Sequence, residues 1–370
     1  MTVMAQRKAA NQTMASKVEV VPLKAENWDF NPGVAEFADG PDGPVMKVVA
    51  RGYVVLKNTD IGDGTIEFDD QPTDEQFASF YFHWQDSLEN EVFYFRPAVG
   101  AGKPYAINGV QYAPTIKGVN CWNLMYHYQT GASYERQKVN HVRLVISGRQ
   151  MRVYVNSQEP CLEVPCLEGN VAHGTLAFNG KHVISHLVLK PGQTDGLSPA
   201  EGLDPTRSDT RYLRHWQVTA AQDVAAPVDF SMASMPGKET VWSPIVAERR
   251  GLVNLTRLYG GDPASGHPTH RICWLKTTIH ADSARLANLR LGFEDEVWMF
   301  LNGAWLYTDK NGFGFPIAKV PAGRLSLENT TVVLPLRKGE NELLIGVGSN
   351  FFGWGIAARL DDLNGVEPQR

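Results

Sequence analysis

Short runs of alternating apolar and polar residues follow one another along almost the whole sequence. Alternation with a period of two is typical of β-strands that bury one face. Pairs of turn-forming residues separate the runs, for example Asp63-Gly64 and Ser147-Gly148. No long segment shows the 3.6-residue period of an amphipathic helix. The sequence therefore predicts an all-β protein built from sandwiches or barrels.

The composition changes between residues 191 and 212, where Gly, Pro, Ser, Asp and Thr replace most of the apolar residues. Such a segment is typical of a linker. A second β-rich block begins at residue 213 with Leu-Arg-His-Trp-Gln-Val. We therefore predict two β-sandwich, or jelly-roll, domains, at residues 17–190 and 213–365, joined by a linker over 191–212.

Charge and hydropathy exclude two classes of partner. The formal net charge is −5 and no basic stripe interrupts it, which argues against nucleic-acid binding. No apolar run approaches the roughly 18 residues of a membrane span. The polar N-terminus lacks the apolar core of a signal peptide, so we expect a cytoplasmic protein unless a leader was removed. The sequence leaves the oligomeric state open.

The cysteines and acidic residues predict no cofactor. The spacing of the 4 cysteines matches neither a disulfide framework nor a zinc site. Pairing of Cys161 with Cys166 is an alternative to free thiols, which we favour. Structural calcium is an alternative for several turn aspartates, although solvated turns explain them more simply. These aspartates are Asp60, Asp63, Asp69, Asp70 and Asp74.

Residues 89–114, ENEVFYFRPAVGAGKPYAINGVQYAP, hold two strand-like runs, Val92–Arg96 and Ile107–Ala113. In the first run, alternation places Tyr94 and Arg96 on one face and the intervening phenylalanines on the other. Gln111 is available from the second run. A sheet face with a guanidinium, an amide and an aromatic ring suits a hydroxylated ligand, because it combines planar donors with an apolar platform.

Residues 122–128, WNLMYHY, also alternate. Trp122 and Tyr126 belong to an aromatic set, and Asn123 and His127 belong to a hydrogen-bonding set. We interpret this run as a strand between the core and a groove. Asn123 and His127 are therefore candidate ligand contacts.

Glu67 is the candidate carboxylate of the same groove. If neighbouring strands of one sheet carry Glu67, Arg96 and Gln111, the face holds one carboxylate, one cation and one amide. The alternative is a structural ion pair between Glu67 and Arg96. The third carboxylate of a glucanase-type Glu-x-Asp-x-x-Glu motif is missing, because residue 72 is Pro.

The order of motifs in the first block resembles the concanavalin A-like lectin/glucanase superfamily. The resemblance rests on GDGTIEFDDQP (62–72), FASFYFHWQ (77–85), ENEVFYFRP (89–97), GVQYAP (109–114) and VNHVRLVISGRQMRVYVN (139–156). The block is also similar to the 3-keto-disaccharide hydrolase branch of that superfamily. That branch carries Asn-Ser-Gly before the strand with the arginine, where this chain has Glu89-Asn90-Glu91.

The second block resembles galactose-binding-domain-like sandwiches attached to glycan-processing enzymes. The carrying segments are GFEDEVWMFLNGAWLY (292–307), LRKGENELLIGV (336–347) and FGWGIAARL (352–360). The aromatic stretch Asn350–Trp354 lies between glycines and is predicted to pack between the two domains.

These patterns predict a glycan-associated protein that binds an oligosaccharide or polysaccharide on the concave sheet of its first domain. The predicted contacts are Tyr94, Arg96, Gln111, Asn123 and His127. One alternative is a glycoside or keto-glycoside hydrolase that uses Glu67 as acid/base in the same groove. Another alternative is a non-catalytic interaction scaffold.

Overall fold

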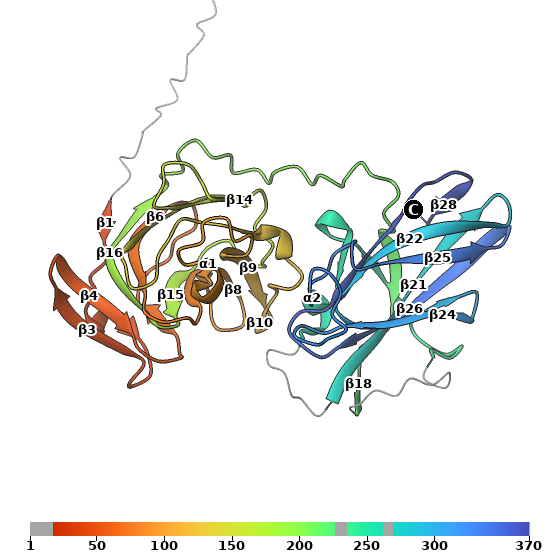
Figure 1. Ribbon diagram of the computed structural model, residues 1–370, viewed down its shortest axis with the longest axis horizontal. Coiled ribbons are helices and arrows are strands. Elements are labelled where there is room, and N and C mark those ends of the chain that lie inside the picture. The colour runs from red at the N-terminus through yellow and green to blue at the C-terminus, as the bar shows by residue number, and fades with distance from the viewer. Residues whose placement is uncertain (1–17, 226–234, 262–268, 370) are drawn as a thin grey trace, which may run out of the picture.

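The computed structural model describes residues 18–225, 235–261 and 269–369, and its strands form two groups of sheets (Figure 1). The all-β fold class is confirmed. Helices within the described residues are short: α1 (Pro97–Gly100), α2 (Leu255–Tyr259), and the 3-10 turns η1 (Ala25–Asn27), η2 (Tyr126–Tyr128) and η4 (Arg249–Gly251). The polar N-terminal stretch discussed above lies outside the described residues.

The first sandwich consists of two sheets that face each other. One has the strand order β14 (Leu162–Val164), β13 (Gln150–Val155), β12 (Asn140–Ser147), β6 (Gly64–Pro72), β16 (His182–Pro191), β4 (Gly43–Val48) and β3 (Ala35–Gly40), and β1 (Glu19–Val20) pairs with β16. The other has the order β10 (Val119–Asn120), β9 (Val110–Ile116), β8 (Asn90–Phe95), β7 (Ala78–Trp84), β15 (Thr175–Asn179), β5 (Val54–Leu56) and β2 (Trp28–Asp29), and β11 (Gln129–Thr130) pairs with β9.

Alternating apolar side chains fill the space between these two sheets. Ile66 and Phe68 of β6 belong to the core, and the Phe68 ring lies 4.8 Å from that of Phe80 on β7. The hairpin predicted around Ser147-Gly148 is present, since β12 and β13 pair antiparallel up to Ser147 and Gln150.

The second sandwich also has two sheets. One has the order β19 (Ser243–Val246), β17 (His215–Val218), β21 (Thr269–Ala281), β26 (Gly339–Ser349), β23 (Asp295–Leu301) and β24 (Ala304–Asn311), and both β18 (Gln222–Ala225) and β28 (Val366–Pro368) pair with β21. The other has the order β20 (Leu252–Asn254), β27 (Gly355–Leu360), β22 (Arg285–Phe293) and β25 (Thr330–Leu336). A separate apolar cluster lies between them.

The connection between Pro191 and His215 is extended along both sandwiches (Figure 1). Leu197 packs in a small cluster with Val145 and Tyr154 of the first sandwich. At its other end, Tyr212 forms a bridge with Arg359 of the second sandwich. The segment is therefore anchored along its length. The domain boundaries predicted from the composition stay a prediction.

One predicted strand is wrong. Residues 122–128 form turns and η2, because the Asn120 side chain accepts from the Trp122 N–H at 3.0 Å and the Leu124 N–H donates to the Cys121 carbonyl at 3.1 Å. Such local hydrogen bonds compete with strand pairing. In the second sandwich, β20 ends at Asn254, whose side chain caps α2 by accepting from the Arg257 N–H at 3.1 Å.

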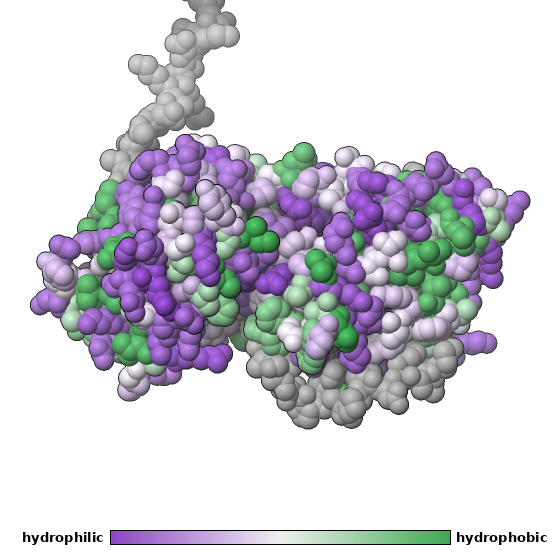
Figure 2. Space-filling view, in the orientation of Figure 1, coloured by the Kyte–Doolittle hydropathy of each residue, from purple (hydrophilic) through white to green (hydrophobic). Residues whose placement is uncertain are grey.

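The surface is mixed. In Figure 2, hydrophilic residues cover most of the visible face and are interspersed with small hydrophobic patches. Within the described residues, no helix has the length and apolar character needed to cross a membrane. All 4 cysteines are free, so the Cys161–Cys166 pairing is wrong.

Candidate functional site

The sheet that contains β7, β8 and β9 turns an aromatic face away from the core. As predicted from the alternation, Phe93 and Phe95 lie in the core of the first sandwich. Tyr94 lies on the opposite face, in a separate cluster with Tyr81 and Trp84 of β7. This is the face on which the sequence predicts a ligand.

Arg96 follows β8 and organises a buried hydrogen-bond network at the edge of this face. It is 7% exposed. Its Nη2 donates to the Tyr94 hydroxyl at 3.1 Å and to Oε1 of Gln111, and its Nη1 donates to Oε1 of Gln129 at 3.2 Å. Tyr94 and Gln111 are register partners on β8 and β9. The structure therefore brings the predicted residues Tyr94, Arg96 and Gln111 together.

Gln111 links this network to the turn that carries Trp122. Its Oε1 accepts from the Tyr94 hydroxyl at 2.9 Å, and its Nε2 donates to the backbone carbonyls of Trp122 at 2.8 Å and Met125 at 3.3 Å. The residue is fully buried. Gln111 therefore positions Arg96 and Trp122 from beneath.

The Trp122 indole is half-buried, and groups from both sandwiches surround it. The guanidinium carbon of Arg96 lies 6.0 Å from the ring centre, and that of Arg324 lies 5.0 Å from it. The rings of Phe313 and Phe351 meet the indole edge-on at centroid distances of 5.1 and 6.3 Å. We call the following set the Trp122 face: Phe77, Tyr94, Arg96, Trp122, Phe313, Arg324 and Phe351.

Aromatic rings at the rim of the Trp122 face are open to solvent. Phe77 is 57% exposed and packs edge-on against Tyr94. Phe313 is 45% exposed, and its ring lies parallel to that of Phe351 at an interplanar angle of 2°. The contacts of Trp122 with Phe351 and Phe352 confirm that the aromatic loop near the C-terminus packs between the two sandwiches.

Arg324 supplies a second guanidinium to the Trp122 face. Its Nη1 donates to the Ala322 carbonyl at 2.9 Å, and its buried Nε has no hydrogen-bond partner among the described residues. Burial lowers the pKa of Arg324, and the nearby charge of Arg96 lowers it further. The two arginines therefore repel each other across the indole.

Glu294 is a buried carboxyl that interacts electrostatically with Arg324. It is 1% exposed. Burial raises the pKa of Glu294 well above its usual value, and the neighbouring Asp295 raises it further. Both effects favour the neutral form of the carboxyl, while the nearby Arg324 guanidinium opposes them.

Asn123 joins the two sandwiches. Its Nδ2 donates to the Gly353 carbonyl at 2.7 Å, and its Oδ1 accepts from the Gly353 N–H at 3.2 Å. The side chain also hydrogen-bonds Glu294 and is fully buried. This geometry corrects the expectation that Asn123 lines a groove on the polar side of a strand.

His127 lines a cavity of about 220 Å³ between the two sandwiches. Its Nε2 is buried and has no hydrogen-bond partner among the described residues. Burial lowers the pKa of His127 to about 3, so the imidazole is neutral. Arg96 is not part of the lining of this cavity, and a groove shared by His127 and Arg96 stays a prediction.

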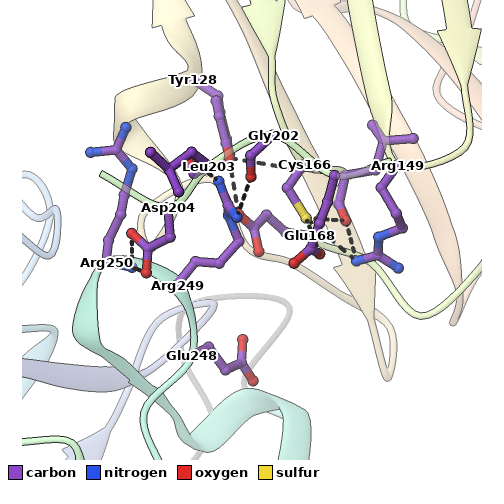
Figure 3. A network of polar contacts seen from close by, with 12 residues as sticks. Tyr128, Arg149, Cys166, Glu168, Gly202, Leu203, Asp204, Glu248, Arg249 and Arg250 are labelled. Carbon is purple, nitrogen blue, oxygen red and sulfur yellow. Dashed lines mark hydrogen bonds and ion pairs between the residues drawn. The ribbon is translucent and has the colours of Figure 1, made fainter. Parts of the chain in front are cut away.

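A polar network borders this cavity (Figure 3). Arg249 of the second sandwich donates to the carbonyls of Gly202 at 2.9 Å and Leu203 at 3.1 Å in the connecting segment. It also pairs with the Glu168 carboxylate at 3.5 Å, which accepts from the Tyr128 hydroxyl at 2.9 Å. The network thus ties both sandwiches to the connecting segment.

Glu67 lies on the other sheet of the first sandwich. Its strand, β6, pairs with β12 and β16, and its carboxylate accepts from Lys190 at 2.8 Å. The core residues on either side of Glu67 direct its side chain outward. Both sequence hypotheses are corrected, since Glu67 neither shares a sheet with Arg96 nor pairs with it.

Sequence reasoning missed Arg324 and Phe313. They lie about two hundred residues after Trp122, and no local pattern marks either as a partner of the first sandwich. Their only sequence signal was the turn pair Asn311-Gly312, which predicts a loop at that point.

The turn aspartates are engaged in separate contacts. Asp69 accepts from both His141 and His186, each at 2.9 Å, and Asp70 pairs with His182 at 2.7 Å. Within the parts of the chain that the structure describes, no group of three His, Cys, Asp or Glu side chains is arranged to hold a metal ion.

No protein-family model and no curated protein matches the sequence. Solved structures that align with the chain include the carbohydrate-binding module CBM66 from Bacillus subtilis, at 12% identity and a TM-score of 0.32. The alignment covers 45% of this chain and 92% of that module.

A β-glucanase from Bacillus licheniformis aligns at 10% identity and a TM-score of 0.34, over 49% of this chain and 100% of the enzyme. The exoplasmic/lumenal domain of VIP36, bound to Ca²⁺ and Man3GlcNAc, aligns at 12% identity and a TM-score of 0.31, over 46% and 86%.

Proposed function

We propose that this protein binds a saccharide on the Trp122 face. The observation that carries the proposal is the partly exposed Trp122 indole, with one guanidinium from each sandwich and the Phe313 ring around it. The apolar C–H faces of a sugar pack on aromatic rings, and guanidinium N–H groups donate to its oxygens. The resemblance of the first block to concanavalin A-like lectins agrees with this function.

The proposed site includes residues of both sandwiches, whereas the predicted groove lies on the first domain alone. Tyr94, Arg96 and Gln111 form the part of the site beneath the indole, and the second sandwich adds the Phe313 and Arg324 side chains. Binding therefore depends on residues from both halves of the chain.

No observation favours hydrolysis. General acid/base chemistry needs a carboxyl within hydrogen-bond reach of the substrate. Glu67 lies on the opposite sheet, and Glu294 is fully buried and hydrogen-bonded to Asn123 beneath the face. The hydrolase alternative is therefore not proposed.

The first test compares the saccharide affinity of the wild type with that of a variant that lacks an exposed ring of the Trp122 face. A glycan array identifies a ligand of the wild type, and calorimetric titration then compares Phe313→Ala with Phe315→Ala. Phe315 is 57% exposed in the same loop but lies outside the Trp122 face, so it is the matched control. We expect Phe313→Ala to weaken binding about tenfold, because an exposed ring at the rim is lost.

Two outcomes oppose the proposal. We expect the wild type to bind at least one saccharide on the array, and complete absence of binding would reject the function. Equal saccharide affinity of the wild type and Phe313→Ala would show that the saccharide binds outside the Trp122 face.

A further inference from the structure

Two arginines lie against one indole without a visible countercharge. Arg96 follows β8 in the first sandwich, and Arg324 precedes β25 in the second. Their guanidinium carbons lie 6.0 and 5.0 Å from the centre of the Trp122 ring. Two like charges that are withdrawn from water at close range destabilise each other unless an opposite charge compensates them.

The hydrogen-bond partners of both arginines are neutral. Arg96 donates to Tyr94, Gln111 and Gln129, and Arg324 donates to a backbone carbonyl. Within the described chain, neither arginine has a carboxylate at ion-pair distance.

Two other half-buried arginines of this protein, Arg257 and Arg290, are paired with acids. Arg257 contacts the Glu248 carboxylate at 2.6 Å, and Arg290 contacts that of Asp361 at 2.8 Å. Glu294 is a buried carboxyl that interacts electrostatically with Arg324, and burial raises its pKa well above the usual value. Among the residues that the structure describes, neither guanidinium at the Trp122 face forms a salt bridge with an acid.

Unused donors remain on both guanidinium groups. The Nε atoms of Arg96 and Arg324 are buried and have no hydrogen-bond partner among the described residues. Guanidinium groups bind carboxylate and sulfate oxygens through paired, charge-assisted hydrogen bonds. A neutral hydroxyl accepts a hydrogen bond from the same donors but leaves both charges unbalanced.

We infer that the saccharide bound at the Trp122 face is acidic, and that its carboxylate or sulfate group is held by Arg96 and Arg324 together. This inference rests on the proposed function and names the class of its ligand. The sugar ring packs against the aromatic rim while the anionic group faces the two guanidinium groups. Because the arginines come from different sandwiches, the anion also links the two halves of the molecule.

The test is a glycan array of matched pairs. Each pair holds an acidic oligosaccharide and its neutralised form, with uronates beside their methyl esters and sulfated sugars beside their desulfated forms. The wild type is expected to bind the acidic member of at least one pair at least tenfold more tightly than the neutral member. The kind of pair that responds distinguishes a carboxylate from a sulfate.

A charge-matched variant locates the effect. Arg324→Gln is expected to reduce affinity for the acidic member about tenfold or more while changing affinity for the neutral member less. Arg337→Gln removes the same charge from an exposed position outside the face and is expected to bind like the wild type. Wild-type affinity for the acidic member is also expected to fall as salt concentration rises, a measurement that needs no variant.

The outcomes separate the two proposals. Equal binding of acidic and neutral members overturns the inference and leaves saccharide binding intact. A preference for acidic sugars that Arg324→Gln retains in folded protein also overturns it. Failure of the wild type to bind any sugar on the array rejects the proposed function and the inference together.

Discussion

At the scale of single residues, Glu91 is a carboxyl buried at the end of the first core. It is fully buried, and its two oxygens accept from the Tyr112 hydroxyl at 2.7 Å and the Gly169 N–H at 3.1 Å. Burial raises the pKa of Glu91 from an ordinary value near 4.5 to about 8, although these hydrogen bonds oppose the shift. Between these two pKa values, the Glu91 carboxyl is protonated in the folded protein and ionised in the unfolded chain.

This proton predicts a pH dependence of stability. Between about pH 4.5 and 8 the unfolded chain ionises Glu91 while the folded chain does not, so the free energy of unfolding falls as pH rises through this window. The stability from this group is complete at low pH and is lost by the upper end of the window. Glu91→Gln is expected to reduce the fall, whose limit is about 1.4 kcal/mol per pH unit for one group.

Urea unfolding at pH 5 and pH 8 measures this effect. Glu163→Gln is the control, because the Glu163 side chain is 62% exposed and pairs only with Arg152 at the surface. The control is expected to keep the wild-type pH dependence. A wild type equally stable at both pH values, or a Glu91→Gln variant with the same slope, would contradict the assignment of this proton to Glu91.

At the scale of elements, the turn at residues 121–125 carries the proposed site. The backbone bond from Leu124 to Cys121 shapes the turn, and Gln111 holds its carbonyls from the first sandwich. Asn123, which belongs to this turn, connects it to the second sandwich. Its side chain bonds both the N–H and the carbonyl of Gly353. The position of the Trp122 indole therefore depends on contacts from both sides.

Removal of the Asn123 amide tests this dependence. Asn123→Ala leaves the Gly353 N–H and carbonyl without their partner in a buried place, so we expect a loss of about 2–4 kcal/mol in the free energy of unfolding. Saccharide affinity is expected to fall as well, because the indole is released. Asn364→Ala, at an exposed position, is the control in denaturant titrations. Unchanged stability of Asn123→Ala would show that the turn is held by other contacts.

Alternation in the sequence predicted which side chains share a face, but not which strands share a sheet. Phe93 and Tyr94 were assigned to opposite faces correctly, because a strand has a strict period of two. Glu67 was placed beside Arg96 incorrectly, because the partners of β6 are set by long-range pairing with β12 and β16. Alternation also suggested a strand at 122–128, where side-chain bonds to the backbone form a turn instead.

At the scale of the whole molecule, the two sandwiches share apolar and polar contacts. Leu252, Leu325 and Ala357 belong to the second sandwich by sequence but pack in the core cluster of the first. Lys117 donates to the Leu258 carbonyl at 2.6 Å, and Arg257 donates to the Glu168 carbonyl at 2.7 Å. The sequence predicted two sandwiches, but the residues that join them are far apart in the chain and follow no shared pattern.

This shared interior predicts that the two sandwiches unfold as one unit. Leu325 is 6% exposed, and Leu325→Ala is expected to cost about 2–4 kcal/mol by opening a cavity between the sandwiches. Differential scanning calorimetry should show one transition for the wild type, with calorimetric and van't Hoff enthalpies in agreement, and a lower Tm for the variant. Leu286→Ala, at a position 73% exposed, is the control. Two separate wild-type transitions, only one of which moves in Leu325→Ala, would instead identify independent domains.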